Sequence, residues 1–411
     1  MIKLVITFLS YILIFFNTNL LSDEKNDELK VGLLVPFTGE YKNLGNSLLL
    51  STQLALSEID NKKIKIIPRD SGSNNKEKLN DSIKEIIELG AKVIIGPTDS
   101  ENFPELKKYE DTIFISLSNK QPEISNNIIS VGISLDSQIK ALEEFIISQK
   151  KTKTIIMYPK NEYTNFIDQK LKKIKLKNYK IFRYNPDPKI LTGEIEKLTN
   201  YSQRKRNLET RKKLLEKNED DASKRKLINL EKRYTLGKVN FDSVIIIDFG
   251  NNLKSVLASL IFADVSDDEV LFTTVNQWFD ESIFYENSVK NLYYPSVDFK
   301  NFKKYNNEYF NAFEIYPNEI TILAYDALGL IYYIWKKNNG INSVSDFLIK
   351  EKIKGKIGNF SFNKGVVTQE LKIYKTQNKK FIKYLFFSLV FYKQYTYDPS
   401  LFFFFFTSLQ K

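Results

Sequence analysis

The sequence predicts an α/β protein of two lobes, each built on a parallel β-sheet that helices cover on both faces. The first observation is an alternation, from residue 30 to about 134, of short apolar runs rich in Ile and Val with longer amphipathic stretches. Buried strands that alternate with helices are typical of parallel sheets. The alternation then restarts, and 411 residues suffice for two domains with separate cores.

The first α/β unit is predicted to contain five strands with helices between them. The strands are the apolar runs 30–37, 63–70, 92–97, 112–118 and 128–133. Two of the intervening stretches place apolar residues on one helical face: Leu48, Leu49, Thr52, Ala55, Leu56 and Ile59 in one, and Leu79, Ile83, Ile86 and Ile87 in the other.

The second α/β unit begins with a helix at 134–148. Strands are predicted at 153–159, 179–185 and 242–250, and a helix at 162–175. Farther along, 269–278 and 291–295 predict strands and 319–337 predicts a helix. The periodicity of these last runs does not say which lobe they join.

The loop after the first strand contains Gly39 and Gly45, which raises the question of a phosphate site. A P-loop requires Gly-x-x-x-x-Gly-Lys-Ser/Thr, because the lysine neutralises phosphate and the hydroxyl holds magnesium. Here the glycines stand one residue too far apart, and Asn46 occupies the lysine position. The Rossmann spacing is also missing. The sequence argues against a nucleotide site, although a helix start remains suited to a carboxylate or another polar small molecule.

Composition excludes several classes of function. The chain has no histidine and no cysteine, which excludes Ser-His-Asp and Cys-His nucleophiles, disulfides, thiolate zinc and a lipidated N-terminal cysteine. The formal charge of +11 is concentrated outside the two α/β units: residues 203–233 hold +6, and the two chain ends hold most of the rest. We therefore expect no nucleic acid as partner, and a binding protein rather than an enzyme.

The N-terminus predicts export. Lys3 precedes a thirteen-residue apolar core at 4–16, which is short for a membrane span, and Ser22 is a small residue suited to cleavage. We expect a signal peptide at 1–22 and a periplasmic protein; an uncleaved anchor is the alternative. The other end, 381–411, holds nine phenylalanines and is interpreted as an atypical tail.

A charged segment interrupts the second unit at 198–236. It contains no predicted strand, and residues 218–223 indicate a turn between two helices. The segment can be a solvated helical extension or a docking arm for an acidic partner or membrane surface. Five of its basic residues are expected to be exposed: Arg204, Lys205, Arg206, Lys212 and Lys213.

Three stretches resemble type I periplasmic binding proteins of the leucine/isoleucine/valine-binding kind. They are residues 31–56, 86–102 and 320–334, and the similarity extends from about 30 to 380. The resemblance implies two lobes joined by three crossings, with a small polar ligand between them. It assigns 30–134 plus 270–337 to lobe 1, and 135–269 plus 340–380 to lobe 2, with the charged insertion 198–236 inside lobe 2.

Within that family, 241–265, 275–281 and 357–374 look most like the penicillin-binding protein activators, as does the charged insertion before Phe241. The resemblance implies a non-catalytic exported protein that supports a peptidoglycan synthase. Some activators are lipoproteins, but the absence of cysteine excludes lipid attachment here. The alternative is a solute receptor for branched-chain or other amino acids that delivers to an ABC permease. An acid-based glycosidase would need a close carboxylate pair in a cleft, and no linear feature indicates one.

Candidate ligand contacts follow the ends of predicted parallel strands, where ligands bind in open α/β sheets. In lobe 1 the resemblance implies a carboxylate-binding loop, but a negative Asp99 would repel a carboxylate, and the same residues are also typical of a helix N-cap. Glu40, Asp99 and Asp248 could in principle hold a divalent cation, but these acidic residues are not closely spaced in the sequence. We therefore expect no metal or other cofactor. The predicted contacts are Thr98, Asp99, Ser100, Ser116 and Ser118 in lobe 1, and Asn161, Tyr163, Asp248 and Trp278 in the rest of the chain. Trp278 could stack on a ligand, although a lone tryptophan after an apolar strand is more often a core residue.

Overall fold

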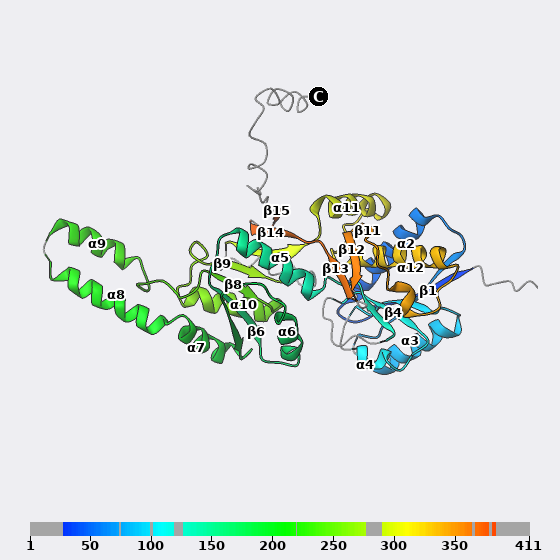
Figure 1. Cartoon of the computed structure of the whole chain (residues 1–411), viewed down its shortest axis with the longest axis horizontal. Helices are drawn as coiled ribbons and strands as arrows, with labels where there is room; N and C mark the ends of the chain where they lie inside the picture. The colour runs from blue at the N-terminus through cyan, green and yellow to red at the C-terminus, as the bar shows by residue number, and fades with distance from the viewer. Residues whose placement is uncertain are drawn as a thin grey trace, which may run out of the picture.

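The computed structural model of the chain describes residues 28–73, 75–98, 102–118, 126–218, 220–276, 290–363, 366–377 and 380–383. Two lobes lie side by side along the long axis, and a helical hairpin projects from the second lobe on the side away from the first (Figure 1). The predicted signal peptide at 1–22 and residues 384–411 of the predicted tail lie outside the described residues, whereas residues 381–383 of that tail belong to a strand of the second lobe.

Lobe 1 is built on an eight-stranded sheet in the order β11-β12-β13-β5-β4-β3-β1-β2. Strands β1 to β5 and β13 are parallel, whereas β11, β12 and β13 pair antiparallel. Helices α2 and α12 cover one face and α3 and α4 the other, so the adjacent residues Leu33 and Leu34 enter different cores. The bounds are β1 Leu29–Val35, α2 Lys42–Ile59, β2 Ile64–Asp70, α3 Lys76–Glu88, β3 Val93–Ile95, α4 Phe103–Leu106, β4 Ile113–Ser116, β5 Ile128–Ser130, α11 Phe299–Phe313, α12 Thr321–Asn338, η2 Val344–Phe347, β11 Ile353–Gly355, β12 Gly358–Asn363 and β13 Val366–Gln369.

Lobe 2 is built on a seven-stranded sheet in the order β15-β14-β10-β9-β8-β6-β7. Strands β6 to β10 are parallel, and β14 and β15 extend the sheet antiparallel. Helices α7 and α10 pack on one face, and α5 and α6 on the other. The bounds are α5 Leu135–Ser148, β6 Thr154–Pro159, α6 Thr164–Leu171, β7 Tyr179–Tyr184, α7 Pro188–Leu198, α8 Tyr201–Glu216, α9 Asp221–Glu231, β8 Ser243–Ile246, α10 Gly250–Phe262, β9 Leu271–Thr274, β10 Leu292–Ser296, β14 Lys372–Gln377 and β15 Lys380–Lys383.

The predicted fold class is confirmed: two sheets with parallel cores are each sandwiched by helices. Most predicted elements agree with observed ones within a few residues, as α5 and β6 illustrate against the predictions 134–148 and 153–159. Within the described ranges, no helix combines the length and apolar composition that crossing a bilayer requires.

The division of the chain between the lobes differs from the one predicted. Strands β9 and β10 lie within 270–337, which was assigned to lobe 1, yet they extend the parallel sheet of lobe 2 beside β8. Conversely, β11 to β13 lie within 340–380, which was assigned to lobe 2, and pair in lobe 1. Strand pairing is a long-range contact, and a short apolar run carries no local signal for the sheet that it joins.

The glycine-containing loop after β1 is held by a carboxylate of its own chain. The Asp70 carboxylate accepts hydrogen bonds from the Phe37 amide at 2.9 Å, the Gly72 amide at 3.1 Å and the Thr38 hydroxyl at 2.7 Å. Partial burial opposes ionisation of Asp70, but these hydrogen bonds outweigh it and lower its pKa. A β-carbon at Gly45 would lie 1.8 Å from the Pro36 carbonyl oxygen, so only glycine lets α2 approach this closely.

Candidate functional site

The predicted lobe 1 contacts lie where β3 and β4 end. Thr98, Ser116 and Ser118 are buried. The Ser116 hydroxyl accepts a hydrogen bond from the Ser118 amide at 3.2 Å and lies 3.5 Å from the Pro97 carbonyl, to which it donates. The Ser130 hydroxyl, from β5, donates to the Ser118 carbonyl at 3.2 Å. These hydroxyls therefore connect neighbouring strand ends.

Three of the other predicted contacts, Asp99, Ser100 and Trp278, lie outside the described residues. The ranges 99–101, 119–125 and 277–289, which include these residues, are not among the described residues. The roles of all three residues stay predictions.

In lobe 2, Asn161 and Tyr163 form the turn that opens α6. The Asn161 side-chain oxygen accepts the Tyr163 amide at 3.0 Å, and the Asn161 amide donates to the Thr164 hydroxyl at 3.0 Å. An asparagine that accepts from the backbone two residues later is a common way to begin a turn. Asn161 is exposed, whereas Tyr163 is half-buried and packs against the core beneath α5 and α6.

The carboxylate of Asp248 is engaged by a residue that the sequence did not indicate. The buried hydroxyl of Tyr184, at the end of β7, donates to Asp248 across the intervening strand β6. Burial raises the pKa of Tyr184, and the adjacent Asp248 carboxylate raises it further. Because 64 residues separate the two side chains, no local pattern could have revealed this pair.

The chain passes between the lobes after β5, after β10 and after β13, and buried amides join these crossings. Gln369 accepts from the Ser134 amide at 3.3 Å and donates to the carbonyl oxygens of Val131 and Gly132 at 3.3 and 3.2 Å. The first and third crossings are thereby linked through one side chain.

A second amide network connects the first crossing to the second. The Asn276 amide donates to the Gln138 side-chain oxygen at 2.7 Å, and Gln138 donates to the Ile133 carbonyl at 3.0 Å. The Asn276 side chain donates to the Pro295 carbonyl at 3.2 Å. Because buried amides are costly to leave without partners, these bonds restrain the relative orientation of the lobes.

The projecting hairpin consists of α8, α9 and the segment to Leu236, and is here called the arm. Its base is fixed by Arg204, which the sequence predicts to be exposed. That prediction is wrong: Arg204 is 7% exposed and donates to the carbonyl oxygens of Gly237 at 3.0 Å, Ala263 at 3.0 Å and Asp264 at 2.7 Å. Burial lowers the pKa of Arg204, and the Asp264 carboxylate, 3.8 Å away, opposes that shift.

Both ends of the arm meet at this anchor. The Leu236 amide donates to the Arg204 carbonyl at 3.0 Å, and the Thr235 hydroxyl donates to the Asp264 carboxylate. Within the arm, Leu208 and Leu215 are buried, and Leu227 and Leu230 are half-buried. The arm is thus a packed helix pair with a rigid attachment.

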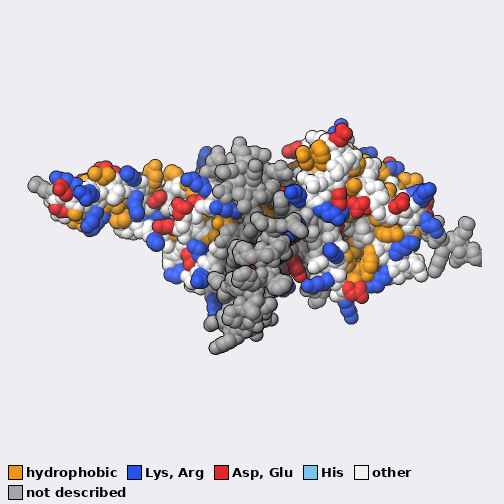
Figure 2. Space-filling view, turned by 90° about the horizontal axis from the view of Figure 1, so that it is seen from above, with side chains coloured by type: hydrophobic (Ala, Val, Ile, Leu, Met, Phe, Trp, Pro, Cys, Tyr) orange, Lys and Arg blue, Asp and Glu red, His pale blue; other side chains and the backbone are white. Residues whose placement is uncertain are grey.

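The rest of the arm exposes basic side chains. Figure 2 shows Lys and Arg along the length of the arm, with fewer Asp and Glu. Ion pairs that join two described residues in this region are Lys224 with Asp221, at 4.0 Å, and Arg204 with Asp264. The exposed basic residues are Lys205, Arg206, Arg211, Lys213, Lys217, Lys224, Arg225, Lys226, Lys232 and Arg233.

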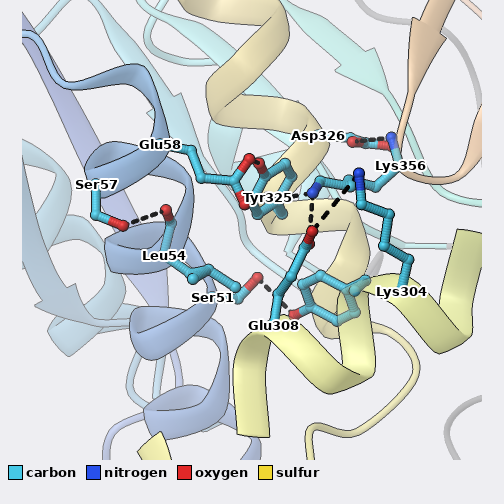
Figure 3. Close-up of polar contacts among 10 residues, drawn as sticks. Ser51, Leu54, Ser57, Glu58, Lys304, Glu308, Tyr325, Asp326 and Lys356 are labelled. Atoms are coloured by element: carbon cyan, nitrogen blue, oxygen red, sulfur yellow. Dashed lines mark hydrogen bonds and ion pairs between the residues drawn. The ribbon is translucent and has the colours of Figure 1, made fainter. Parts of the chain in front are cut away.

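A different arrangement of charge occurs in lobe 1, in what we call the Lys356 cluster: Glu58, Glu308, Tyr325, Asp326 and Lys356. The Lys356 ammonium group lies 3.3 Å from Glu58, contacts Glu308, and stands 5.0 Å from the centre of the Tyr325 ring (Figure 3). The Asp326 carboxylate accepts the backbone amides of Lys356 at 2.7 Å and Ile357 at 2.8 Å. Burial raises the pKa of Asp326 to about 6. The cluster fixes the β11–β12 turn onto α2, α11 and α12.

The described residues contain no group of three or more acidic side chains placed to hold a metal ion. Asp248 and Glu40 belong to different lobes, and Asp99 lies outside the described ranges. The described polar groups at the strand ends are hydroxyls, amides and one buried carboxylate, which suit hydrogen bonding to a small polar molecule.

Comparisons with known proteins agree with this architecture. Residues 28–174 match the family model described as periplasmic binding protein. No curated protein matches the sequence. Among solved structures, the leucine-binding protein LivK from Thermotoga maritima has a TM-score of 0.58 at 11% identity, covering 87% of this chain and 98% of that one.

Two other structures represent different roles on the same fold. The substrate-binding protein LivJ from Streptococcus pneumoniae, in complex with isoleucine, has a TM-score of 0.54 at 15% identity over 86% of this chain and 97% of that one. The C-domain of LpoA from Haemophilus influenzae, a regulator of PBP1A, has a TM-score of 0.52 at 12% identity over 87% of this chain and its full length. At such identities the likeness shows the fold alone. The chain therefore has the fold of type I periplasmic binding proteins, and its residues 28–174 match the model of a periplasmic binding protein family.

Proposed function

We propose that this protein is a non-catalytic exported binding protein that acts as a penicillin-binding protein activator, stimulating a peptidoglycan synthase by direct contact. The observation that carries the proposal is the arm. It is fixed to lobe 2 by the buried Arg204 and projects away from lobe 1 (Figure 1). A receptor that only encloses a solute needs two lobes and a hinge, but has no use for a rigid external hairpin.

The chemistry of the arm supports a protein partner. Its exposed lysines and arginines far outnumber the ion pairs that they form among described residues. Exposed, unbalanced charge steers an oppositely charged partner and fixes its orientation. The fold shared with the LpoA C-domain, a PBP1A regulator, is compatible with such a role.

The strand ends of lobe 1 support the same proposal. The Ser116 hydroxyl is engaged with the Ser118 amide and the Pro97 carbonyl. A ligand carboxylate at this point would have to compete with these bonds, and Asp99 adds an unfavourable charge nearby in sequence.

The test is excision of the arm above its anchor. Because the Leu236 amide bonds to the Arg204 carbonyl, residues 206–233 can be replaced by a short Gly-Ser turn that leaves Arg204 and Thr235 in place. We expect the excised protein to keep its thermal stability but to lose at least tenfold in affinity for peptidoglycan synthases purified from the source organism, together with stimulation of their glycan polymerisation. Full stimulation by the excised protein, or no binding by the intact one, would refute the proposal.

The alternative is a solute receptor of an ABC importer. It is favoured by the neighbours solved with isoleucine and with benzoate, and by the polar residues Tyr163 and Asp248 beside strand ends of lobe 2. Calorimetry against leucine, valine, polar amino acids and benzoate decides between the two. Micromolar binding that disappears in Ser116→Ala or Tyr163→Ala, with unchanged melting temperature, would establish the receptor instead.

A further inference from the structure

The arm's exposed surface divides into two faces of different chemistry. The packed positions are Arg204, Leu208, Lys212 and Leu215 on α8 and Ser223, Leu227 and Leu230 on α9, which are buried or half-buried. In an antiparallel helix pair, residues that precede the packed positions on both helices lie on one side, and residues that follow them lie on the other. The arm therefore has two exposed sides whose composition can be compared.

The first side is here called the docking face. It consists of Gln203, Asn207, Arg211, Leu214, Ala222, Lys226 and Asn229, all exposed. It has two basic residues and no acidic one. Leu214 is 51% exposed and lies at the end of this face nearest the turn between α8 and α9, so Arg211 separates it from the amides of α8. The Gln203 side chain donates to Asn207 at 2.9 Å, which aligns two of the amides along α8.

The second side is here called the balanced face. It consists of Lys205, Glu209, Lys213, Glu216, Lys224, Ile228 and Glu231, also exposed. Three basic residues are offset by three acidic ones, so the net charge is zero. Alternating charge of this kind is typical of a solvated helix surface. The excess of positive charge is thus not uniform around the arm.

We propose that the docking face is the surface through which the arm binds the synthase, and that it contacts a carboxylate-rich protein surface with an apolar recess for Leu214. This inference rests on the function proposed above and names the part of the arm responsible. Arginine and amide side chains beside an exposed apolar residue can form contacts that exclude water, and a face without acidic groups avoids repulsion of carboxylates. On the balanced face, Glu209, Glu216 and Glu231 would repel such a partner.

The chain offers a matched control for each substitution. Arg211→Glu with Lys226→Glu reverses two charges on the docking face, and Lys213→Glu with Lys224→Glu reverses two on the balanced face. Leu214→Asp and Ile228→Asp form a second pair, because both residues are about half exposed, at 51% and 55%. All six positions lie on the same two helices, and total charge changes equally within each pair.

The measurement is affinity for the synthase and stimulation of its activity at low and physiological salt, with melting temperature as a check on folding. We expect the docking-face variants to lose at least tenfold in affinity, and the balanced-face variants to change less than threefold. The residual binding of Arg211→Glu/Lys226→Glu should depend less on salt than wild-type binding, since screened charges contribute most of that dependence.

The outcomes separate the two proposals. If the intact protein binds no synthase, both fail. Suppose instead that the intact protein binds and stimulates the synthase, but the docking-face and balanced-face variants lose affinity equally or not at all. The assignment of the docking face is then wrong, and the activator function stands. Binding to vesicles of phosphatidylglycerol that is lost with Arg211→Glu/Lys226→Glu, without effect on the synthase, would assign this face to the membrane and overturn the inference.

Discussion

The Lys356 cluster of lobe 1 and the arm of lobe 2 contain the same kinds of side chain in opposite settings. In the cluster, one ammonium group is placed between two carboxylates and an aromatic ring, at the junction of three helices and a turn. On the arm, ten exposed basic residues have few partners among described residues. Charge that is paired internally fixes a fold, whereas charge left exposed on a rigid support is available to a partner. Arg204 belongs with the first kind, although it lies in the arm.

The largest expected effect tests that assignment of Arg204. Arg204→Met keeps a long apolar stem but leaves three carbonyl oxygens without a donor, so we expect a loss of about 2–4 kcal/mol in the free energy of unfolding. Urea denaturation followed by circular dichroism measures it, with Lys205→Met as the exposed neighbour. If both substitutions lowered the free energy of unfolding equally, Arg204 would be no more important for stability than its exposed neighbour.

The next effect concerns pH and Asp326 in the cluster. Its folded pKa, about 6, lies above the ordinary value of 3.8. The stabilising contribution of the protonated form is therefore complete below about pH 4 and lost as the pH rises through 6. We expect the free energy of unfolding attributable to Asp326 to fall by about 2–3 kcal/mol across this window. Denaturation of wild type and Asp326→Asn at pH 4, 5, 6 and 7 measures this contribution. If the free energies of unfolding of the two proteins changed in parallel with pH, the raised pKa of Asp326 would be contradicted.

A smaller effect is expected from Lys356 itself. Lys356→Met keeps the contact with the Tyr325 ring but leaves Glu58 and Glu308 without their shared cation. Because both carboxylates are partly exposed, we expect a loss of about 1 kcal/mol, larger at low than at high salt. Lys304, 3.7 Å from Glu308 and well exposed, is the control, and Lys304→Met should have little effect. Similar losses of stability in both variants would mean that Lys356 stabilises the fold no more than an exposed lysine does.

The smallest effect is expected on the arm. Replacing Lys205, Arg206, Lys212 and Lys213 with glutamine retains helix propensity, and we expect a change within about half a kcal/mol per site. Thermal melts of this variant and of wild type should nearly coincide. A large destabilisation would show that the charges of the arm stabilise the fold, as those of the Lys356 cluster are expected to do.

Local sequence patterns determined the secondary structure and the fold class of this protein. The apolar runs at 112–118 and 153–159 predict β4 and β6 because residues buried on both faces of a sheet must be apolar in succession. The alternation with amphipathic helices predicts the layers, and the charge run with a turn at 218–223 predicts the helix pair of the arm. Each of these inferences depends only on neighbours in the chain.

Tertiary structure alone decided which segments meet. The sequence could not place β9 and β10 in lobe 2, because strand pairing depends on distant partners. It likewise concealed the Tyr184–Asp248 hydrogen bond and the Gln369 contacts across two crossings. The ligand roles of Thr98, Ser116 and Asp248 stay predictions, since a polar strand end looks the same whether it faces a ligand or its own backbone. Arg204 and Lys205 are adjacent basic residues in one charge run. Only the packing of α8 against the 235–237 and 263–264 segments makes one an anchor and the other a surface residue.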